Sequence, residues 1–427
     1  MNILLRKLGL AENKGLYWTA EKKWKKLGLP FRIQKNLELI NPTAFFCINN
    51  EFYILFFENP AQREEKKVHR EIWNFSQAPL AFIIDDTKIS VFNAFHLDNL
   101  DKKGKRGLQM LDELDINDSP GKTDTYSIWN LISGKFWEDN KNAFKSDGRV
   151  DWYLLKNIEE AILLLKEKNL ARKIANKIIG FLIFTRYLID RKVKIDEKYI
   201  NNKSVEQVRK SLLTVIQVPA QLIGFYNHLK NAFNGDLFEL SAVELKGIDF
   251  KHCEILHILF QGGGVLKKQP SLFDIYDFEI IPIELVSNVY ERFIGKVKQK
   301  KSKAFYTPPF LVDYILEKTV AKHLKKAGSS RCRVLDPACG SGIFLVETFR
   351  QIVEKEKKLK GDKFSTKELE GLLIDNIYGI DDDAGAIDIA IFSLYITLLD
   401  YKEPREIVNY KFPYLKYKEN KSDSERG

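Results

Sequence analysis

The residues with the clearest chemical potential form an acidic, glycine-rich turn. Residues 334–344 read Val-Leu-Asp-Pro-Ala-Cys-Gly-Ser-Gly-Ile-Phe, so an apolar run ends at Asp336 and a second one begins after Gly342. This pattern predicts a buried strand, a tight turn and the start of a helix, which together form a cradle for a nucleotide-containing cofactor. Glycine allows close backbone approach and a positive φ at such a turn.

The turn does not fit two common phosphate-binding patterns. It lacks Gly-x-x-x-x-Gly-Lys-Ser/Thr, and Asp336 and Pro337 occupy the place where Gly-x-Gly-x-x-Gly would begin. An acid before the glycines suits a cofactor that presents an ammonium group better than one that presents a pyrophosphate. S-adenosylmethionine has such a group, and Asp336 is the residue predicted to bind it, directly or through water.

A second acidic strand end follows about 40 residues later. Residues 377–383 read Ile-Tyr-Gly-Ile-Asp-Asp-Asp. In folds of this kind the acid at the tip of the second strand hydrogen-bonds a ribose diol, and Asp381 is the best-placed candidate. Asp382 and Asp383 suit the N-cap of a helix predicted over residues 384–399.

A third segment precedes the turn. Residues 304–315 read Ala-Phe-Tyr-Thr-Pro-Pro-Phe-Leu-Val-Asp-Tyr-Ile, which predicts a helix with Thr307 as its N-cap. A hydroxyl at a helix N-terminus can bind a carboxylate. An ordinary capped helix is the alternative interpretation.

Three regions must position these residues. Strands are predicted at 52–57, 80–84 and 89–92, the last two as a hairpin, with a helix over 64–75 and a polar linker over 98–125. From residue 150 to about 260 the apolar period becomes helical, and a further helix is predicted over 283–293. The predicted domains are an α/β domain at 1–105, a helical domain at 125–300 and a cofactor-binding domain at 301–427.

Composition sets the wider limits. The 427 residues carry a net charge of +10, which favours a polyanionic partner, although solubility alone also explains it. The four cysteines have no Cys-x-x-Cys spacing, which predicts no zinc knuckle and fits a reducing cytoplasm. No stretch approaches a signal peptide or a membrane span of about 20 apolar residues, and neither a membrane partner nor a metal site is expected.

The three segments resemble those of adenine-specific (N6) DNA methyltransferases in which the cofactor half precedes the catalytic half. Residues 306–308, 336–344 and 379–381 are similar to the first cofactor motif, the main S-adenosylmethionine motif and the ribose-binding acid. Residues 281–293 resemble the helix that precedes the first motif in large type IIG-like restriction–modification proteins, and residues 176–191 resemble the helical region of those proteins. The resemblance implies a Rossmann-like half-domain, double-stranded DNA as substrate and S-adenosylmethionine as cofactor. The predicted cofactor-binding residues are Phe305, Tyr306, Thr307, Asp336, Ala338, Cys339, Gly340, Gly342, Phe344 and Asp381.

The sequence departs from that family at the catalytic motif. The family carries an Asn/Asp-Pro-Pro-aromatic loop after the cofactor motifs, where amide and carbonyl oxygens accept hydrogen bonds from the target amino group and the ring stacks on the flipped base. Residues 307–310 read Thr-Pro-Pro-Phe, with threonine in place of the amide and ahead of the glycine turn. No catalytic residue is therefore assigned. We expect a truncated or split methyltransferase, inactive alone; the alternatives are a non-catalytic subunit acting with a separate chain and an inert gene fragment.

The N-terminal domain invites a nuclease interpretation. Type IIG-like proteins often carry a restriction-nuclease fold here, which needs an acid and an acid-x-Lys pair to hold magnesium. Asp86 and Lys88 have the spacing but lie at a predicted hairpin tip, where both residue types are common. Magnesium is expected only if this domain is an active nuclease, and a degenerate nuclease fold is the favoured interpretation.

Overall fold

The structure is a computed structural model. It describes residues 1–59, 65–86, 88–97, 107–115, 117, 120–145, 148–233, 239–261, 275–281, 307, 309–361, 365–407 and 410–415. The chain forms two compact units, one of Met1–Ile158 with Leu259–Pro282 and the other of Glu159–Ile258 with Ile283–Gly427. Phe305, Tyr306 and the whole of the predicted helix over 283–293 lie outside the described residues.

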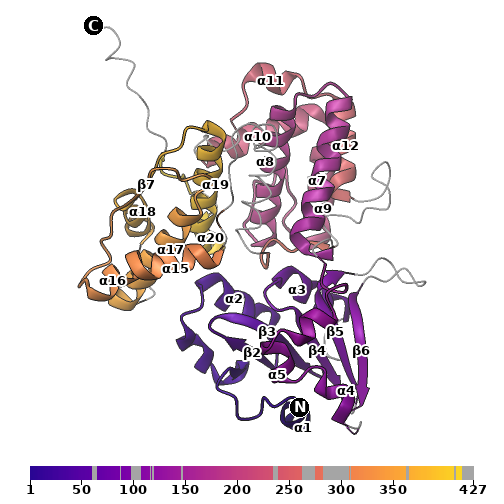
Figure 1. Ribbon diagram of the computed structural model, residues 1–427. Coiled ribbons are helices and arrows are strands. Elements are labelled where there is room, and N and C mark those ends of the chain that lie inside the picture. The colour runs from indigo at the N-terminus through magenta and orange to yellow at the C-terminus, as the bar shows by residue number, and fades with distance from the viewer. Residues whose placement is uncertain are drawn as a thin grey trace. The chain divides into compact units, whose positions relative to one another are not determined.

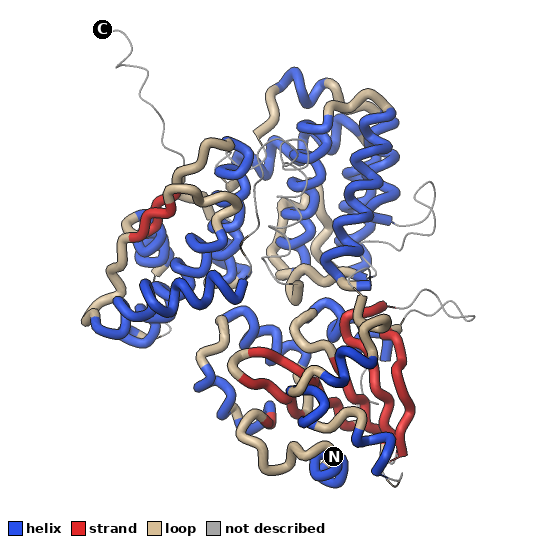
Figure 2. Tube along the Cα trace, viewed as in Figure 1, coloured by secondary structure: helices blue, strands red, loops and turns tan. Residues whose placement is uncertain are grey.

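The first unit is built on a six-stranded mixed sheet in the order β1-β2-β3-β4-β5-β6, seen as red strands in Figure 2. The pair β3–β4 is parallel, while the other neighbouring pairs are antiparallel. The strands are β1 (Leu16–Trp18), β2 (Ala44–Ile48), β3 (Glu51–Glu58), β4 (Leu80–Asp85), β5 (Lys88–Leu97) and β6 (Leu108–Asp115).

Short helices surround this sheet (Figure 1). They are α1 (Asn2–Lys7), η1 (Thr19–Glu21), η2 (Lys23–Leu27), α2 (Phe31–Ile40), α3 (Glu65–Phe75), α4 (Pro120–Asp124), α5 (Ile128–Ile132) and α6 (Lys135–Asp139). Helix α3 provides the crossover between β3 and β4, because parallel neighbours need such a connection.

Apolar side chains from both ends of this unit meet in one core. Phe56, Phe82 and Tyr126 pack together there, with ring centroids 5.4 Å and 5.6 Å apart. The predicted strand at 52–57 and the hairpin of β4 and β5 are confirmed. The linker predicted over 98–125 is wrong in part, because β6 and α4 lie within it. Strand β6 buries Leu108 and Leu114 but exposes Met110 and Glu113, and its Gln, Asp and Glu residues gave it the composition of a linker.

The helical segment from residue 150 to about 260 is confirmed. Helices α7 (Val150–Glu167) and α12 (Phe250–Gln261) contribute residues to both units. The second unit adds α8 (Arg172–Asp190), α9 (Val205–Gln217), α10 (Pro219–Ala232) and α11 (Ala242–Lys246). Helix α8 is buried over most of its length, consistent with a central position among these helices. Within the described residues, none of the helices is both long and apolar enough to span a bilayer.

The remainder of the second unit is an α/β segment around two parallel strands, β7 (Val334–Asp336) and β8 (Ile377–Gly379). Its helical elements are α15 (Pro309–Leu316), the π-helical turn η5 (Glu317–Ala321), α16 (Lys322–Lys326), α17 (Ile343–Lys360), α18 (Thr366–Ile374), α19 (Ala384–Asp400) and α20 (Pro404–Ile407). The chain as a whole is thus mixed α/β. The three predicted domains and their boundaries stay a prediction.

Candidate cofactor site at the ends of strands β7 and β8

The two predicted strand ends lie side by side. Strands β7 and β8 are parallel, and their register pairs Asp336 with Gly379. The carboxyl ends of parallel neighbours face the same edge of a sheet, which is where ligands bind in open α/β sheets. Asp336 and Asp381, 45 residues apart in sequence, therefore belong to one edge.

Backbone hydrogen bonds continue the pairing beyond the strands. The Ile380 N–H donates to the Asp336 carbonyl oxygen at 2.9 Å, and the Cys339 N–H donates to the Ile380 carbonyl oxygen at 2.9 Å. Within the turn, the Gly342 N–H donates to the Cys339 carbonyl oxygen at 2.8 Å. The glycine turn is thus fixed to the loop that follows β8.

Asp381 joins the two loops through its side chain. Its Oδ2 accepts a hydrogen bond from the Gly340 N–H at 2.9 Å, and its Oδ1 accepts one from the Asp383 N–H at 2.9 Å. A carboxylate has about four acceptor positions, so two remain for a ligand. The Asp336 carboxylate is also held by a backbone N–H, because its Oδ1 accepts a hydrogen bond from the Ala338 N–H at 3.1 Å.

The two glycines of the turn are needed for different reasons. Both have a positive φ, +52° at Gly340 and +86° at Gly342, which disfavours other residues. A Cβ at Gly342 would lie 2.8 Å from the Ala390 Cβ, so this glycine lets the turn pack against α19. A Cβ at Gly340 would meet nothing within 4 Å among the described atoms, so this backbone borders open space.

Cys339 lies on the inner side of the turn. It is buried, and burial, with the nearby carboxylates of Asp381 and Asp336, raises the pKa of its thiol to about 11. Its sulfur would lie 3.0 Å from a Cβ placed at Gly379, so Gly379 gives it room. Cys339 therefore fills space as a neutral thiol.

Asn376 was missed by sequence reasoning although it fixes the start of both strands. It is buried; its Oδ1 accepts a hydrogen bond from the Cys332 N–H at 2.8 Å, and its Nδ2 donates to the Leu372 carbonyl oxygen at 2.9 Å. Its backbone oxygen also accepts from the Val334 N–H at 2.8 Å. An asparagine directly before an apolar strand was the available signal.

Helix α19, which was predicted over residues 384–399, supports the glycine turn. Ser393 is buried and donates from Oγ to the Ile389 carbonyl oxygen at 2.8 Å, with a longer contact of 3.4 Å to the Ser341 carbonyl oxygen. Together with Ala390 it provides a face of small residues against which the glycine turn packs. The alanine and serine in this otherwise bulky apolar helix were the signal.

The remaining predicted cofactor residues are placed less directly. Helix α15 begins at Pro309, so Thr307 lies two residues before it and is half-buried. Phe344 packs against the apolar cluster that includes Val312, Leu316 and Ile352. Ala338 is exposed beside the turn. Phe305 and Tyr306 lie outside the described residues.

Among the described residues, Asp86 and Lys88 do not form a metal-binding group with other acidic side chains. Asp86 has a positive φ of 48° at the turn between β4 and β5, and the Lys88 ammonium lies 3.7 Å from the Glu113 carboxylate. Within the described ranges, no group of three or more His, Cys, Asp or Glu side chains could hold a metal ion.

Comparison with known proteins supports the resemblance seen in the sequence. Residues 316–412 match the family model of the MmeI DNA-methyltransferase domain. The chain is 29% identical over 118 residues to the adenine-specific methyltransferase PglX of Streptomyces coelicolor, covering 25% of this chain and 9% of that protein. It is 28% identical over 174 residues to the type II restriction enzyme and methyltransferase RM.Eco57I of Escherichia coli, covering 33% of this chain and 17% of that protein.

Two further similarities were found, one to a curated protein and one to a solved structure. A type II restriction enzyme and methyltransferase of Methanocaldococcus jannaschii is 25% identical over 164 residues, which covers 27% of this chain and 14% of that protein. The cryoEM structure of the DrdV–DNA complex matches with a TM-score of 0.30 and 12% identity, covering 84% of this chain and 33% of that one. The family model and the curated relatives confirm the similarity to large restriction–modification methyltransferases. The matched segments span less than a fifth of the length of these curated relatives.

Proposed function

We propose that this chain binds S-adenosylmethionine at the ends of β7 and β8 and takes part in methyl transfer to N6 of adenine in duplex DNA, within restriction–modification or phage defence. The observation that carries the proposal is the hydrogen-bonded pairing of the glycine turn with Asp381, in a segment similar to the MmeI DNA-methyltransferase domain. The name of the relative PglX supports adenine as the target, and the name of the matching family model supports DNA.

The residues at this edge fit such a cofactor. Open space beside Gly340 leaves room for a ligand against the backbone of the turn. The carboxylates of Asp336 and Asp381 keep acceptor positions for an ammonium group and a ribose diol, and both are fixed by backbone N–H groups. When bound, the cofactor supplies a methyl group on a positively charged sulfur. The Rossmann-like character of this half-domain belongs to the same proposal.

Methyl transfer also needs groups that hold the target adenine, and the 427 residues contain no Asn/Asp-Pro-Pro-aromatic sequence. The amide and carbonyl acceptors that would increase electron density on N6 are thus not identified here. We infer that they lie outside these 427 residues. On this account the chain alone binds the cofactor without completing the reaction.

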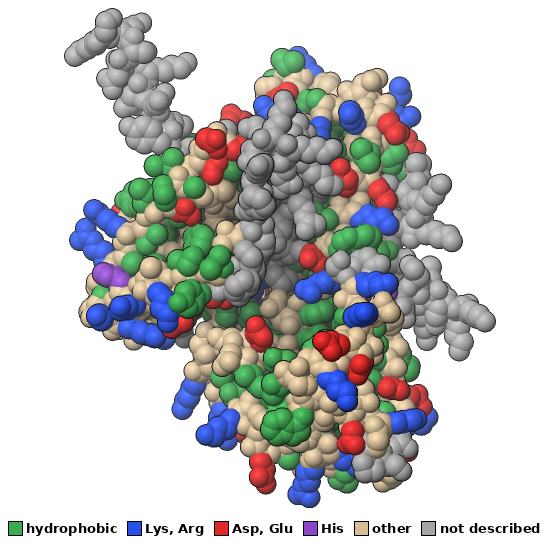
Figure 3. Space-filling model, in the orientation of Figure 1, with side chains coloured by type: hydrophobic (Ala, Val, Ile, Leu, Met, Phe, Trp, Pro, Cys, Tyr) green, Lys and Arg blue, Asp and Glu red, His purple; other side chains and the backbone are tan. Residues whose placement is uncertain are grey.

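The surface of the small sheet exposes apolar side chains. Leu335 and Tyr378 are paired in register and therefore lie on one face, yet they are 56% and 45% exposed. Ile380, just beyond β8, is 57% exposed. Figure 3 shows hydrophobic side chains at the surface among charged ones in this part of the chain. Contiguous exposed apolar residues often mark interaction sites.

The test is transfer of a tritiated methyl group from S-adenosylmethionine to duplex DNA, followed by nucleoside analysis. We expect no transfer by the chain alone, and N6-methyladenine once a chain carrying the Asn-Pro-Pro-aromatic motif is added. Cofactor binding without transfer in any mixture would favour the second candidate, a non-catalytic binding subunit. Transfer to cytosine, or a chain that binds no cofactor, would contradict the proposal.

A further inference from the structure

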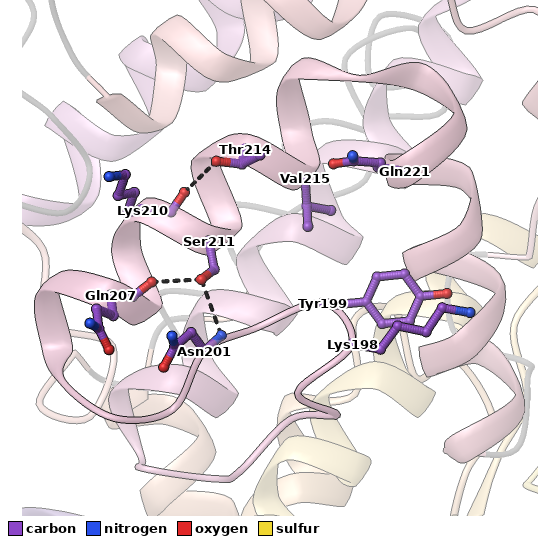
Figure 4. A pocket seen from close by; sticks show the side chains of 9 residues that line it. All are labelled: Lys198, Tyr199, Asn201, Gln207, Lys210, Ser211, Thr214, Val215 and Gln221. Carbon is purple, nitrogen blue, oxygen red and sulfur yellow. Dashed lines mark hydrogen bonds between the residues drawn. The ribbon is translucent and has the colours of Figure 1, made fainter.

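A cavity in the helical part of the second unit has a composition that points to a ligand. It has a volume of about 640 Å³ and lies between the loop before α9 and helices α9 and α10 (Figure 4). Its lining combines ammonium, amide and hydroxyl groups with one aromatic ring and one apolar side chain. The lining residues are Lys198, Tyr199, Asn201, Gln207, Lys210, Ser211, Thr214, Val215 and Gln221.

Among the described residues, the charged side chains that line this cavity are all basic. Two lysines line it, and no carboxylate from the part of the chain that the structure describes does. The surrounding stretch, residues 192–210, holds six basic and three acidic side chains. Of the acids, Asp196 is engaged elsewhere: its Oδ1 accepts from the Lys198 N–H at 2.9 Å, and its Oδ2 lies 3.8 Å from His228 Nε2. Glu197 and Glu206 are exposed and do not line the cavity.

The framework of the cavity is fixed, while its cations are exposed. Ser211 Oγ donates to the Gln207 carbonyl oxygen at 2.7 Å and accepts from the Asn201 N–H at 3.1 Å, which ties the loop to α9, as the dashed lines in Figure 4 show. The Tyr199 ring packs on Phe225 with centroids 5.2 Å apart, and the Lys198 ammonium lies 5.5 Å from the Tyr199 centroid. Lys198 and Lys210 both remain exposed to solvent.

This set of groups matches a phosphodiester backbone. Lysine ammonium groups, amides, hydroxyls and tyrosine are the side chains that contact phosphate and sugar in protein–DNA complexes. The cavity is larger than a single phosphate needs and is lined from a loop and two helices.

We propose that this cavity, which we call the α9–α10 groove, holds backbone phosphates of duplex DNA, with Lys198 and Lys210 as the two cationic contacts. The inference rests on the proposed function, because it places the DNA that the proposed reaction needs. It assigns sequence-independent contacts, since phosphates carry no base information.

The experiment compares the full chain with Lys198→Gln/Lys210→Gln in fluorescence anisotropy titrations of a short labelled duplex at several salt concentrations. We expect the Kd to rise about tenfold for any duplex sequence, and the slope of log K against log salt to fall by about 1.8, as expected for two lost phosphate contacts. The matched control is Lys246→Gln/Lys251→Gln, which removes two exposed lysines of the same unit outside the groove and should leave both quantities unchanged.

Three outcomes would overturn the inference. The first is a groove variant with the parent's affinity and salt slope, and the second is a parent chain that binds no duplex. The third is displacement of the duplex by inorganic phosphate at constant ionic strength, which would identify a small-anion site. Calorimetry with S-adenosylmethionine tests the proposed function separately. If the parent chain binds no cofactor but the groove variant still loses DNA affinity, the assignment of the groove holds and the proposed function is rejected.

Discussion

The Gly340 N–H donates a hydrogen bond of 2.9 Å to the Asp381 Oδ2 across 41 residues of sequence. This single contact joins the glycine turn after β7 to the acidic loop after β8. It makes one site out of two sequence motifs that were identified independently, and the following predictions test the parts of that site.

Replacing Asp381 with Ala should lower the free energy of unfolding, because two backbone N–H groups lose their acceptor. We expect a loss of about 1–3 kcal/mol, measured by urea denaturation. The control is Asp382→Ala, an exposed neighbour of the same charge. Equal stability of the two variants would show that the Asp381 carboxylate does not join the loops.

Replacing Gly342 with Ala should destabilise the fold more than replacing Gly340 with Ala. Both changes place a side chain at positive φ, at a cost of about 1–2 kcal/mol, but only Gly342→Ala also brings a Cβ within 2.8 Å of Ala390. Overpacking adds about 1–3 kcal/mol. Thermal and urea unfolding measure the difference.

A second substitution identifies the source of that cost. In Gly342→Ala/Ala390→Gly the 2.8 Å contact with the Ala390 Cβ is removed, while the 3.0 Å contact with the Cα of residue 390 and the positive φ remain. Part of the lost stability should therefore return beyond the sum of the single changes. If the free-energy changes of the two single substitutions simply add, the close contact with α19 is not the cause of the lost stability.

Asn376→Ala should cost about 2–3 kcal/mol of stability, because the buried Cys332 N–H and Leu372 carbonyl oxygen lose their partner. The matched change Asn227→Ala removes an exposed asparagine from α10 and should be close to neutral. Circular dichroism during urea unfolding provides the measurement. A neutral Asn376→Ala would argue against its role in fixing the strands.

The cysteines should react slowly with a thiol reagent in the folded chain. All four are free and buried, and burial raises the pKa of Cys47, Cys253 and Cys339 to about 11, 12 and 11. The thiolate is the nucleophile, so reaction at pH 8 should require unfolding. Fast stoichiometric reaction of the native chain with Ellman's reagent would contradict this.

The same pKa shifts make stability depend on alkaline pH. Between the ordinary thiol pKa of 9.0 and about 11, the unfolded chain releases the protons of Cys47 and Cys339 while the folded chain retains them. The free energy of unfolding should therefore fall as pH rises through this window. In Cys339→Ala that fall should be smaller, and an unchanged pH dependence would argue against a shifted Cys339 thiol.

Sequence reasoning found the parts of the site that depend on local rules. The strand at 334–336, the positive φ of Gly340 and Gly342 and the helix after Asp383 follow from short-range patterns. The prediction that this strand is buried was wrong, because Leu335 is 56% exposed and its two neighbours in the strand are half-buried. It missed contacts between distant segments, such as the packing of Ala390 on Gly342, because no local pattern encodes which helix covers the turn. Strand β6 was missed because an edge strand with polar side chains reads as a linker.

The most direct test of the central claim is isothermal titration of S-adenosylmethionine into the full chain and into Asp381→Asn, which keeps one oxygen acceptor. The account predicts one binding site per chain in the parent. In the variant it predicts an affinity reduced by about 1–3 kcal/mol, or roughly fivefold to 150-fold. Absence of binding to the folded parent, or equal affinity in the variant, would contradict the assignment of this edge as the cofactor site.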